Sequence, residues 1–182
     1  MTNRRDASIQ SRLAAIIADI DRTGHADVLR LTVLTRWLEQ PPRLRALGLW
    51  VATRAASRGG AATGEAGELF ARAQALLPGN PPPGAEPDRV ELEGLYRRLC
   101  AFQDETVRQR WGPVRILRNH DLLLVEDGLA LHLGLRTMPT DGYRLAVEYC
   151  AHYDSRYGRD LNGPSRDRLL DLIGFVAMQE AA

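Results

Sequence analysis

Apolar residues recur at helical spacing through the first 77 residues and predict four helices joined by short turns. In the first segment, isoleucine and leucine stand three or four positions apart, between Ser8 as a candidate N-cap and Gly24 as a stop. Prolines and glycines interrupt the same periodicity and divide the rest into three further segments. The predicted helices cover about residues 9–23, 26–40, 43–58 and 64–77. This arrangement is typical of a helical bundle.

Residues 78–88 break this pattern. They hold five prolines and two glycines among eleven residues, which sustain neither a helix nor a central strand. The segment is therefore expected to run as an extended, semi-stiff connector. It either joins two small domains or crosses the surface of one compact domain. We favour the first organisation, with a helical bundle over residues 1–77, a linker over 78–88 and a second domain over 89–182.

Beyond the connector, one long helix is predicted from about residue 90 to residue 111, and the period of the apolar residues then changes to two. Three short strands, with a tight-turn signal at Asp127-Gly128, are expected over residues 113–118, 122–126 and 129–136. Two more helices are predicted over about residues 142–157 and 165–179. The predicted fold class is α+β: an N-terminal helical bundle, then a helix, a three-stranded antiparallel β-meander and two C-terminal helices.

The titratable residues exclude several kinds of chemistry. All 24 basic residues are arginine, so neither a lysine Schiff base nor a P-loop lysine exists in this chain. The four histidines and two cysteines show none of the spacings of zinc-binding motifs, and Cys100 and Cys150 are expected in the core. No metal, cofactor or catalytic residue is therefore predicted. Because no apolar run is long enough for a membrane helix and no secretory signal stands at the start, a soluble cytoplasmic protein is expected.

The last predicted helix carries a candidate interaction surface. Its leucines define a buried face, and Phe175 and Met178 are expected to project among charged residues on the opposite side. An apolar pair on a charged face is typical of a contact surface for another protein or a second copy of the chain. With no catalytic signature, this pattern favours a non-catalytic protein of adaptor, regulatory or accessory role that acts by protein–protein binding, with a homodimer as one form.

Charge supplies a first alternative. Residues 1–63 carry a net charge of +5, because they hold ten arginines and five acidic residues, and the remainder carries −4. On the third predicted helix Arg43, Arg54 and Arg58 fall within a sector of about 60°, with Trp50 close by. Such a stripe suits a nucleic-acid-binding regulator that contacts phosphates. A solvated helix face explains the same arginines more simply, because their stems can cover apolar surface, and a basic half that docks on the acidic half is a further explanation.

A second alternative is a small-ligand binder or an enzyme with a pocket between the meander and the tyrosine-rich helix that follows it. The residues that would line this pocket are Arg136, Tyr143, Tyr149, His152 and Tyr153. A tyrosine-rich face is also typical of a core whose hydroxyl groups reach the surface. The sequence leaves these readings open.

Overall fold

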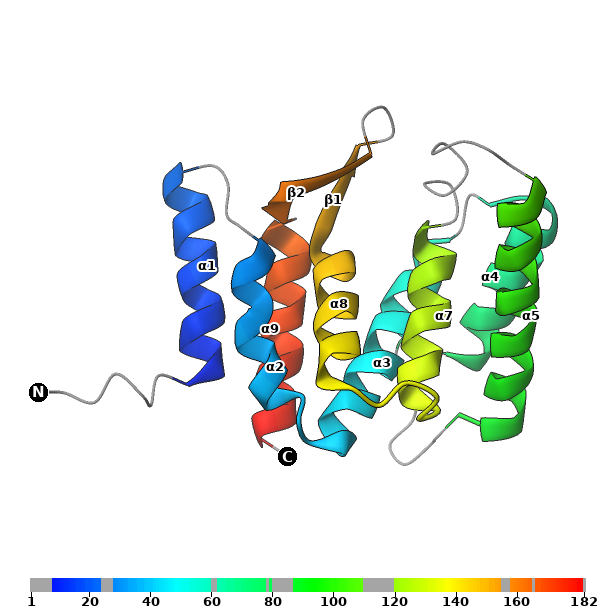
Figure 1. Ribbon diagram of the computed structural model, residues 1–182, viewed down its shortest axis with the longest axis horizontal. Coiled ribbons are helices and arrows are strands. Elements are labelled where there is room, and N and C mark those ends of the chain that lie inside the picture. Colours follow the sequence, from blue (N-terminus) through cyan, green and yellow to red (C-terminus); the bar gives the residue numbers. More distant parts are fainter. Residues whose placement is uncertain are drawn as a thin grey trace, which may run out of the picture. The chain divides into compact units, whose positions relative to one another are not determined.

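The computed structural model describes residues 8–23, 28–59, 62–77, 79, 87–109, 120–154, 158–164 and 166–181, and this part of the chain is predominantly helical (Figure 1). The helices are α1 (Ile9–Thr23), the 3₁₀ helix η1 (Val28–Val33), α2 (Leu34–Trp37), α3 (Pro41–Ala56), α4 (Gly64–Leu76), α5 (Arg89–Gln109), α7 (His120–His132), α8 (Pro139–Cys150) and α9 (Arg166–Ala181). Two short strands, β1 (Ala151–Asp154) and β2 (Gly158–Pro164), pair as an antiparallel hairpin, with Asp154 opposite Gly158. None of these helices is long and apolar enough to cross a membrane.

The predicted α+β fold with its three-stranded β-meander is wrong. The segment expected to hold the second strand and most of the third forms the helix α7, and the first strand, residues 113–118, lies outside the described residues. Eight of the thirteen residues of α7 are buried, so the helix is apolar on most sides and lacks the polar stripe that reveals helical periodicity. The turn signal at Asp127-Gly128 falls inside this helix, where Gly128 serves helix packing instead.

Two compact units make up the chain. The terminal unit combines Met1–Arg43 with Met138–Ala182, and the central unit is Leu44–Thr137. This division differs from the expected boundary at residues 78–88, because the first helices group with the last ones. Independent folding of residues 1–77 and 89–182 stays a prediction.

In the terminal unit α9 packs on α1 and α8, and η1 and α2 pack on α8. An aromatic pair marks the core: the ring of Trp37 stands edge-on to that of Phe175, with centroids 6.2 Å apart and planes at 84°. Such a pair contributes about 0.5–1.5 kcal/mol beyond the burial of its area. The predicted helix over residues 26–40 is present as two shorter helices, η1 and α2.

In the central unit a glycine pair joins α3 to α7. A Cβ atom on Gly48 would lie 2.8 Å from the Cβ atom of Leu131 and closer still to the carbonyl oxygen of Gly128. A Cβ atom on Gly128 would lie 2.5 Å from the carbonyl oxygen of Gly48. The two backbones are therefore in direct contact, and only glycine fits on either side. Helix α5 packs on α4 and α7 in the same unit.

Candidate interaction surface on α9

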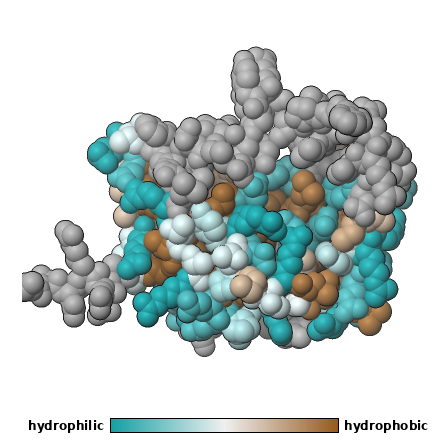
Figure 2. All heavy atoms as spheres, in the orientation of Figure 1, coloured by the Kyte–Doolittle hydropathy of each residue, from teal (hydrophilic) through white to brown (hydrophobic). Residues whose placement is uncertain are grey.

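The outer side of α9 presents apolar residues to solvent. Leu170 is 41% exposed and Met178 is 60% exposed, and Gly174 lies midway between them. Residues four positions apart share one side of a helix, so the three form a stripe that we call the α9 face. On the side of the molecule that Figure 2 shows, apolar side chains form separate small patches among hydrophilic ones.

Among the residues that the structure describes, no side chain or backbone packs where a side chain of residue 174 would begin. A Cβ atom at this position would meet nothing within 4 Å, whereas one at Gly48 or Gly128 would strike backbone atoms. Glycine inside a helix is less favourable than alanine by about 1 kcal/mol, because it loses more backbone freedom on folding. The α9 face therefore carries a local cost in stability that no contact with the described residues explains, and it leaves a notch between two apolar side chains.

The opposite side of α9 is fixed in the core. Leu169, Leu172 and Val176 are buried, and so is Phe175, which is only 3% exposed and packs on Trp37. The sequence pattern predicted that Phe175 and Met178 share one exposed surface. Phe175 is buried instead, so only Met178 is on the outer side of the helix. Phe175 stands at the edge of the buried arc, and Trp37, which is distant in sequence, extends the core far enough to cover it.

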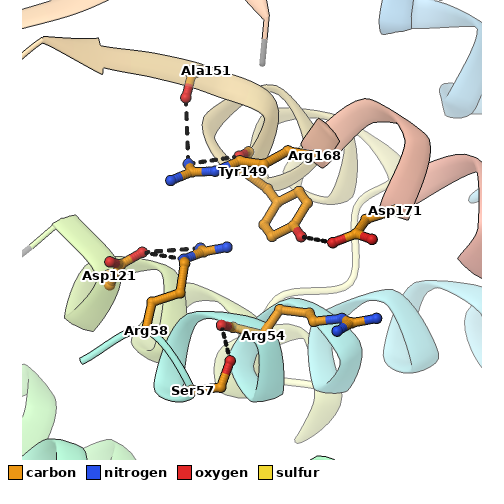
Figure 3. A network of polar contacts seen from close by, with 8 residues as sticks. All are labelled: Arg54, Ser57, Arg58, Asp121, Tyr149, Ala151, Arg168 and Asp171. Carbon is orange, nitrogen blue, oxygen red and sulfur yellow. Dashed lines mark hydrogen bonds and ion pairs between the residues drawn. The ribbon is translucent and has the colours of Figure 1, made fainter. Parts of the chain in front are cut away.

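Polar contacts hold α9 against the end of α8 (Figure 3). The hydroxyl of Tyr149 donates to Oδ2 of Asp171 over 3.2 Å, and the guanidinium of Arg168 lies 5.9 Å from the centre of the Tyr149 ring. Arg168 also donates to the carbonyl oxygens of Tyr149, over 3.0 Å, and Ala151, over 3.4 Å. These carbonyls lie at the C-terminal end of α8, where the helix supplies no donors, so Arg168 satisfies them.

Both ends of α9 are tied to α1. Near the start of α9, Nε of Arg166 donates to Oδ1 of Asp21 over 2.8 Å, and near its end Nε2 of Gln10 donates to Oε2 of Glu180 over 2.9 Å. The hydrogen bond from Arg166 holds the pKa of the Asp21 carboxyl below its usual value. These exposed contacts add little stability, but they place Arg166 and Glu180 on the same edge of α9.

The predicted arginine stripe is divided between the two units. The guanidinium of Arg43 lies 5.1 Å from the centre of the Trp37 ring, in the terminal unit. Arg54 is exposed and lies 5.9 Å from the centre of the Trp50 ring, in the central unit. Stacking on an indole ring is a common use of arginine that needs no nucleic acid.

Arg58 is the third member of that stripe and forms an ion pair. Its Nη2 and Nε atoms donate to Oδ1 of Asp121 over 2.9 and 3.1 Å, which joins the end of α3 to the start of α7 (Figure 3). Both side chains are about a quarter exposed, so the pair is only partly screened by water. The carboxylate cancels a positive charge that phosphate contact would need.

The residues of the predicted ligand pocket do not surround one site. Tyr149 is buried with its hydroxyl engaged, and Tyr143 is half-buried on the same helix. His152 and Tyr153 lie on β1, and their side chains are outside the described part of the structure. Arg136 belongs to the central unit, where it forms an ion pair with an aspartate of α7. Because α7 replaces the meander, the sheet that was to line this pocket is missing.

One polar cluster, formed by Tyr96, Cys100 and Glu126, was not predicted from the sequence. In the central unit, Sγ of Cys100 donates to Oε1 of Glu126 over 3.6 Å, and a hydrogen bond with Cys100, together with burial, raises the pKa of Tyr96 to about 12. Tyr96 and Cys100 are four residues apart on α5, which is a detectable helical pair. Glu126 could not be added to them, because its segment was predicted to be a strand.

Burial also raises the pKa of Cys150 to about 12, which makes this thiol a poor nucleophile at neutral pH.

A groove of about 490 Å³ lies between α4 and α5; its lining is Arg72, Val90, Glu91, Gly94, Leu95 and Arg98. Gly94 resembles Gly174 in that a Cβ atom would meet nothing within 4 Å. An ion pair between Arg72 and Glu91 borders the groove, and only Val90 adds an exposed apolar side chain. The α9 face is more apolar, since Leu170 and Met178 flank its glycine on both sides.

Within the described ranges, no three histidine, cysteine, aspartate or glutamate side chains come together as a metal-binding group. Comparison of the chain with protein-family models, with curated proteins and with solved structures finds no match.

Proposed function

We propose that this chain is a non-catalytic cytoplasmic protein that acts by binding another protein through the α9 face. The observation that carries the proposal is the exposed stripe of Leu170, Gly174 and Met178 on a helix whose other side is anchored in the core. The centres of protein interfaces are depleted of charged residues and enriched in methionine and aromatic residues. An adaptor, regulatory or accessory role fits such a surface.

The energetics favour a partner that lies close to the helix. Covering the exposed parts of Leu170 and Met178 would stabilise a complex by about 1 kcal/mol for each side chain. Without a Cβ atom at Gly174, the partner's atoms can contact the α9 backbone. The partner would thus account for a glycine that weakens the isolated helix.

Site-specific cross-linking tests this proposal. A photo-reactive amino acid in place of Met178 should give a protein adduct in cells, and a second substitution, Leu170→Asp, should abolish it. Leu135→Asp is the matched control, because Leu135 is also an exposed leucine but belongs to the central unit. Absence of an adduct at position 178, or an adduct that survives Leu170→Asp, would contradict the proposal.

The nucleic-acid alternative has weaker support. Arg58 is neutralised by Asp121, and Arg43 lies in a different unit from Arg54. Salt-dependent binding to DNA requires several arginines that act together on phosphates. No observation on the described residues favours a second function over protein binding.

A further inference from the structure

The central unit contains a groove that the proposed function does not use. Helices α4 and α5 pack side by side (Figure 1), and the groove between them has a volume of about 490 Å³. Sites that bind small molecules have volumes of about 300–1,000 Å³. We infer that this groove binds an organic monocarboxylate with an apolar chain. The inference is independent of the α9 face, which belongs to the terminal unit.

The wall that α5 contributes to the groove is apolar at one end and positively charged at the other. Val90, Gly94 and Arg98 follow one another at intervals of four residues, so they share one side of the helix and extend along it by about 12 Å. Val90 is exposed, and Leu95 adds a second, buried apolar side chain to the lining. An elongated ligand in this groove would meet apolar surface along most of its length and a guanidinium group at one end.

Gly94 keeps the middle of the groove open. A Cβ atom at this position would meet nothing within 4 Å, so no described residue requires a glycine here. Glycine inside a helix is less favourable than alanine, because it loses more backbone freedom on folding. The space that a side chain would fill belongs to the groove instead, and an apolar chain can lie directly on the backbone of α5.

The charges of the lining match a ligand with one negative charge. Arg72, Glu91 and Arg98 are the charged residues of the lining, with a net charge of +1, and an ion pair between Arg72 and Glu91 joins α4 to α5. Among the described residues Arg98 has no acidic partner, whereas its neighbour Arg97 lies 3.7 Å from a carboxylate oxygen of Glu93. A guanidinium binds a carboxylate through two parallel hydrogen bonds. A phosphate monoester carries about −1.5 to −2 at pH 7, which exceeds the charge of the lining.

A titration with octanoate, followed by the ¹H–¹⁵N NMR spectrum of the full chain, tests this inference. Octanoate should bind with a dissociation constant of about 1 mM, and the amide shifts should be confined to α4 and α5. Octanol keeps the apolar chain without the charge, and acetate keeps the charge without the chain. Each should bind about tenfold more weakly or worse, and octyl phosphate should bind no more tightly than octanoate.

Two variants test the groove itself. Arg98→Gln removes the unpaired charge and Gly94→Leu fills the middle of the groove, so each should weaken octanoate binding by about tenfold or more. Gly94→Leu should fold normally, because its Cβ atom meets nothing and leucine favours a helix. Arg97→Gln is the matched control, since it makes the same change on the next residue of α5, which is not part of the lining.

Each outcome bears on one part of the inference. Octanoate shifts that do not saturate, or that fall outside α4 and α5, overturn the site, and so does binding that Gly94→Leu leaves unchanged. Equal binding of octanol, or equal losses in Arg98→Gln and Arg97→Gln, overturns the role of the carboxylate. Tighter binding of octyl phosphate overturns the choice of a monocarboxylate. Circular dichroism confirms that each variant is folded, and none of these results bears on the α9 face.

Discussion

Substitution of Gly48 by alanine should force helices α3 and α7 apart. The new methyl group would lie 2.8 Å from the Cβ atom of Leu131 and 2.9 Å from the amide nitrogen of His132, and nearer still to the carbonyl oxygen of Gly128. Ordinary contacts between such atoms are about 3.5–4.0 Å, so the backbone of α7 must move by roughly 1 Å. Main-chain atoms within a helix cannot rotate away from the methyl group as the end of a flexible side chain could.

The expected loss of stability follows from two opposing contributions. Overpacking a well-filled core costs about 1–3 kcal/mol, and the rigid main chain of α7 places this site at the upper end of that range. Alanine recovers about 1 kcal/mol of helix propensity. The net loss is therefore about 2 kcal/mol, which for a chain of this length lowers the melting temperature by about 4–8 °C.

Gly94→Ala is the matched control, because it makes the same chemical change on a helix of the same unit with nothing within 4 Å of the new atom. It should stabilise the chain by up to about 1 kcal/mol. Thermal and urea unfolding followed by circular dichroism, at one protein concentration for all variants, measures both effects. A Gly48→Ala variant as stable as the unaltered chain would refute the direct backbone contact between α3 and α7.

Three other predictions concern individual side chains and their contacts. Because folding raises the pKa of the Cys150 thiol from its ordinary value of 9.0 to about 12, the folded state holds a proton that the unfolded state loses above pH 9. The free energy of unfolding should thus fall as the pH rises above 9. Between pH 8 and pH 10, urea titrations should show that the chain loses about 1.4 kcal/mol more of this free energy than its Cys150→Ala variant does. Equal losses in the two proteins would contradict the burial of this thiol. Phe175→Ala should cost about 3–5 kcal/mol, whereas Met178→Ala on the same helix should change the stability of the monomer by less than about 0.5 kcal/mol. A double-mutant cycle of Arg58→Ala and Asp121→Ala should show a coupling of about 0.5–1 kcal/mol, and a coupling of zero would mean that the pair does not form in solution.

Where a helix has one apolar and one polar side, its sequence was enough to place it. The predicted segments over residues 9–23, 43–58 and 64–77 correspond closely to α1, α3 and α4. Each has charged or small residues on its outer side and a proline, a glycine or a capping residue near an end, so local signals and the fold agree.

The sequence failed where contacts between distant segments decide the structure. Helix α7 is covered on most sides, so its spacing resembles that of alternating strands. The burial of Phe175 depends on Trp37, which no pattern within α9 could reveal. Periodicity alone placed Met178 on the outer side of α9. The difference between Gly174, where a Cβ atom would have open space, and Gly48, where it would strike backbone atoms, is visible only in the folded chain.

The terminal unit is built from the first and the last segments of the chain, and this determines the order in which the chain can fold during synthesis. Residues 44–137 lie between its two parts, so the ribosome makes the whole central unit after α1 and before α9. Helix α1 can therefore pack on η1, which follows it in the chain, but its contacts with α9 form only after the central unit has been made. Domains generally fold as units during translation, and the central unit has all its residues first. The α9 face can consequently form only on a chain that has been translated through both units, so a nascent or prematurely terminated chain cannot present it.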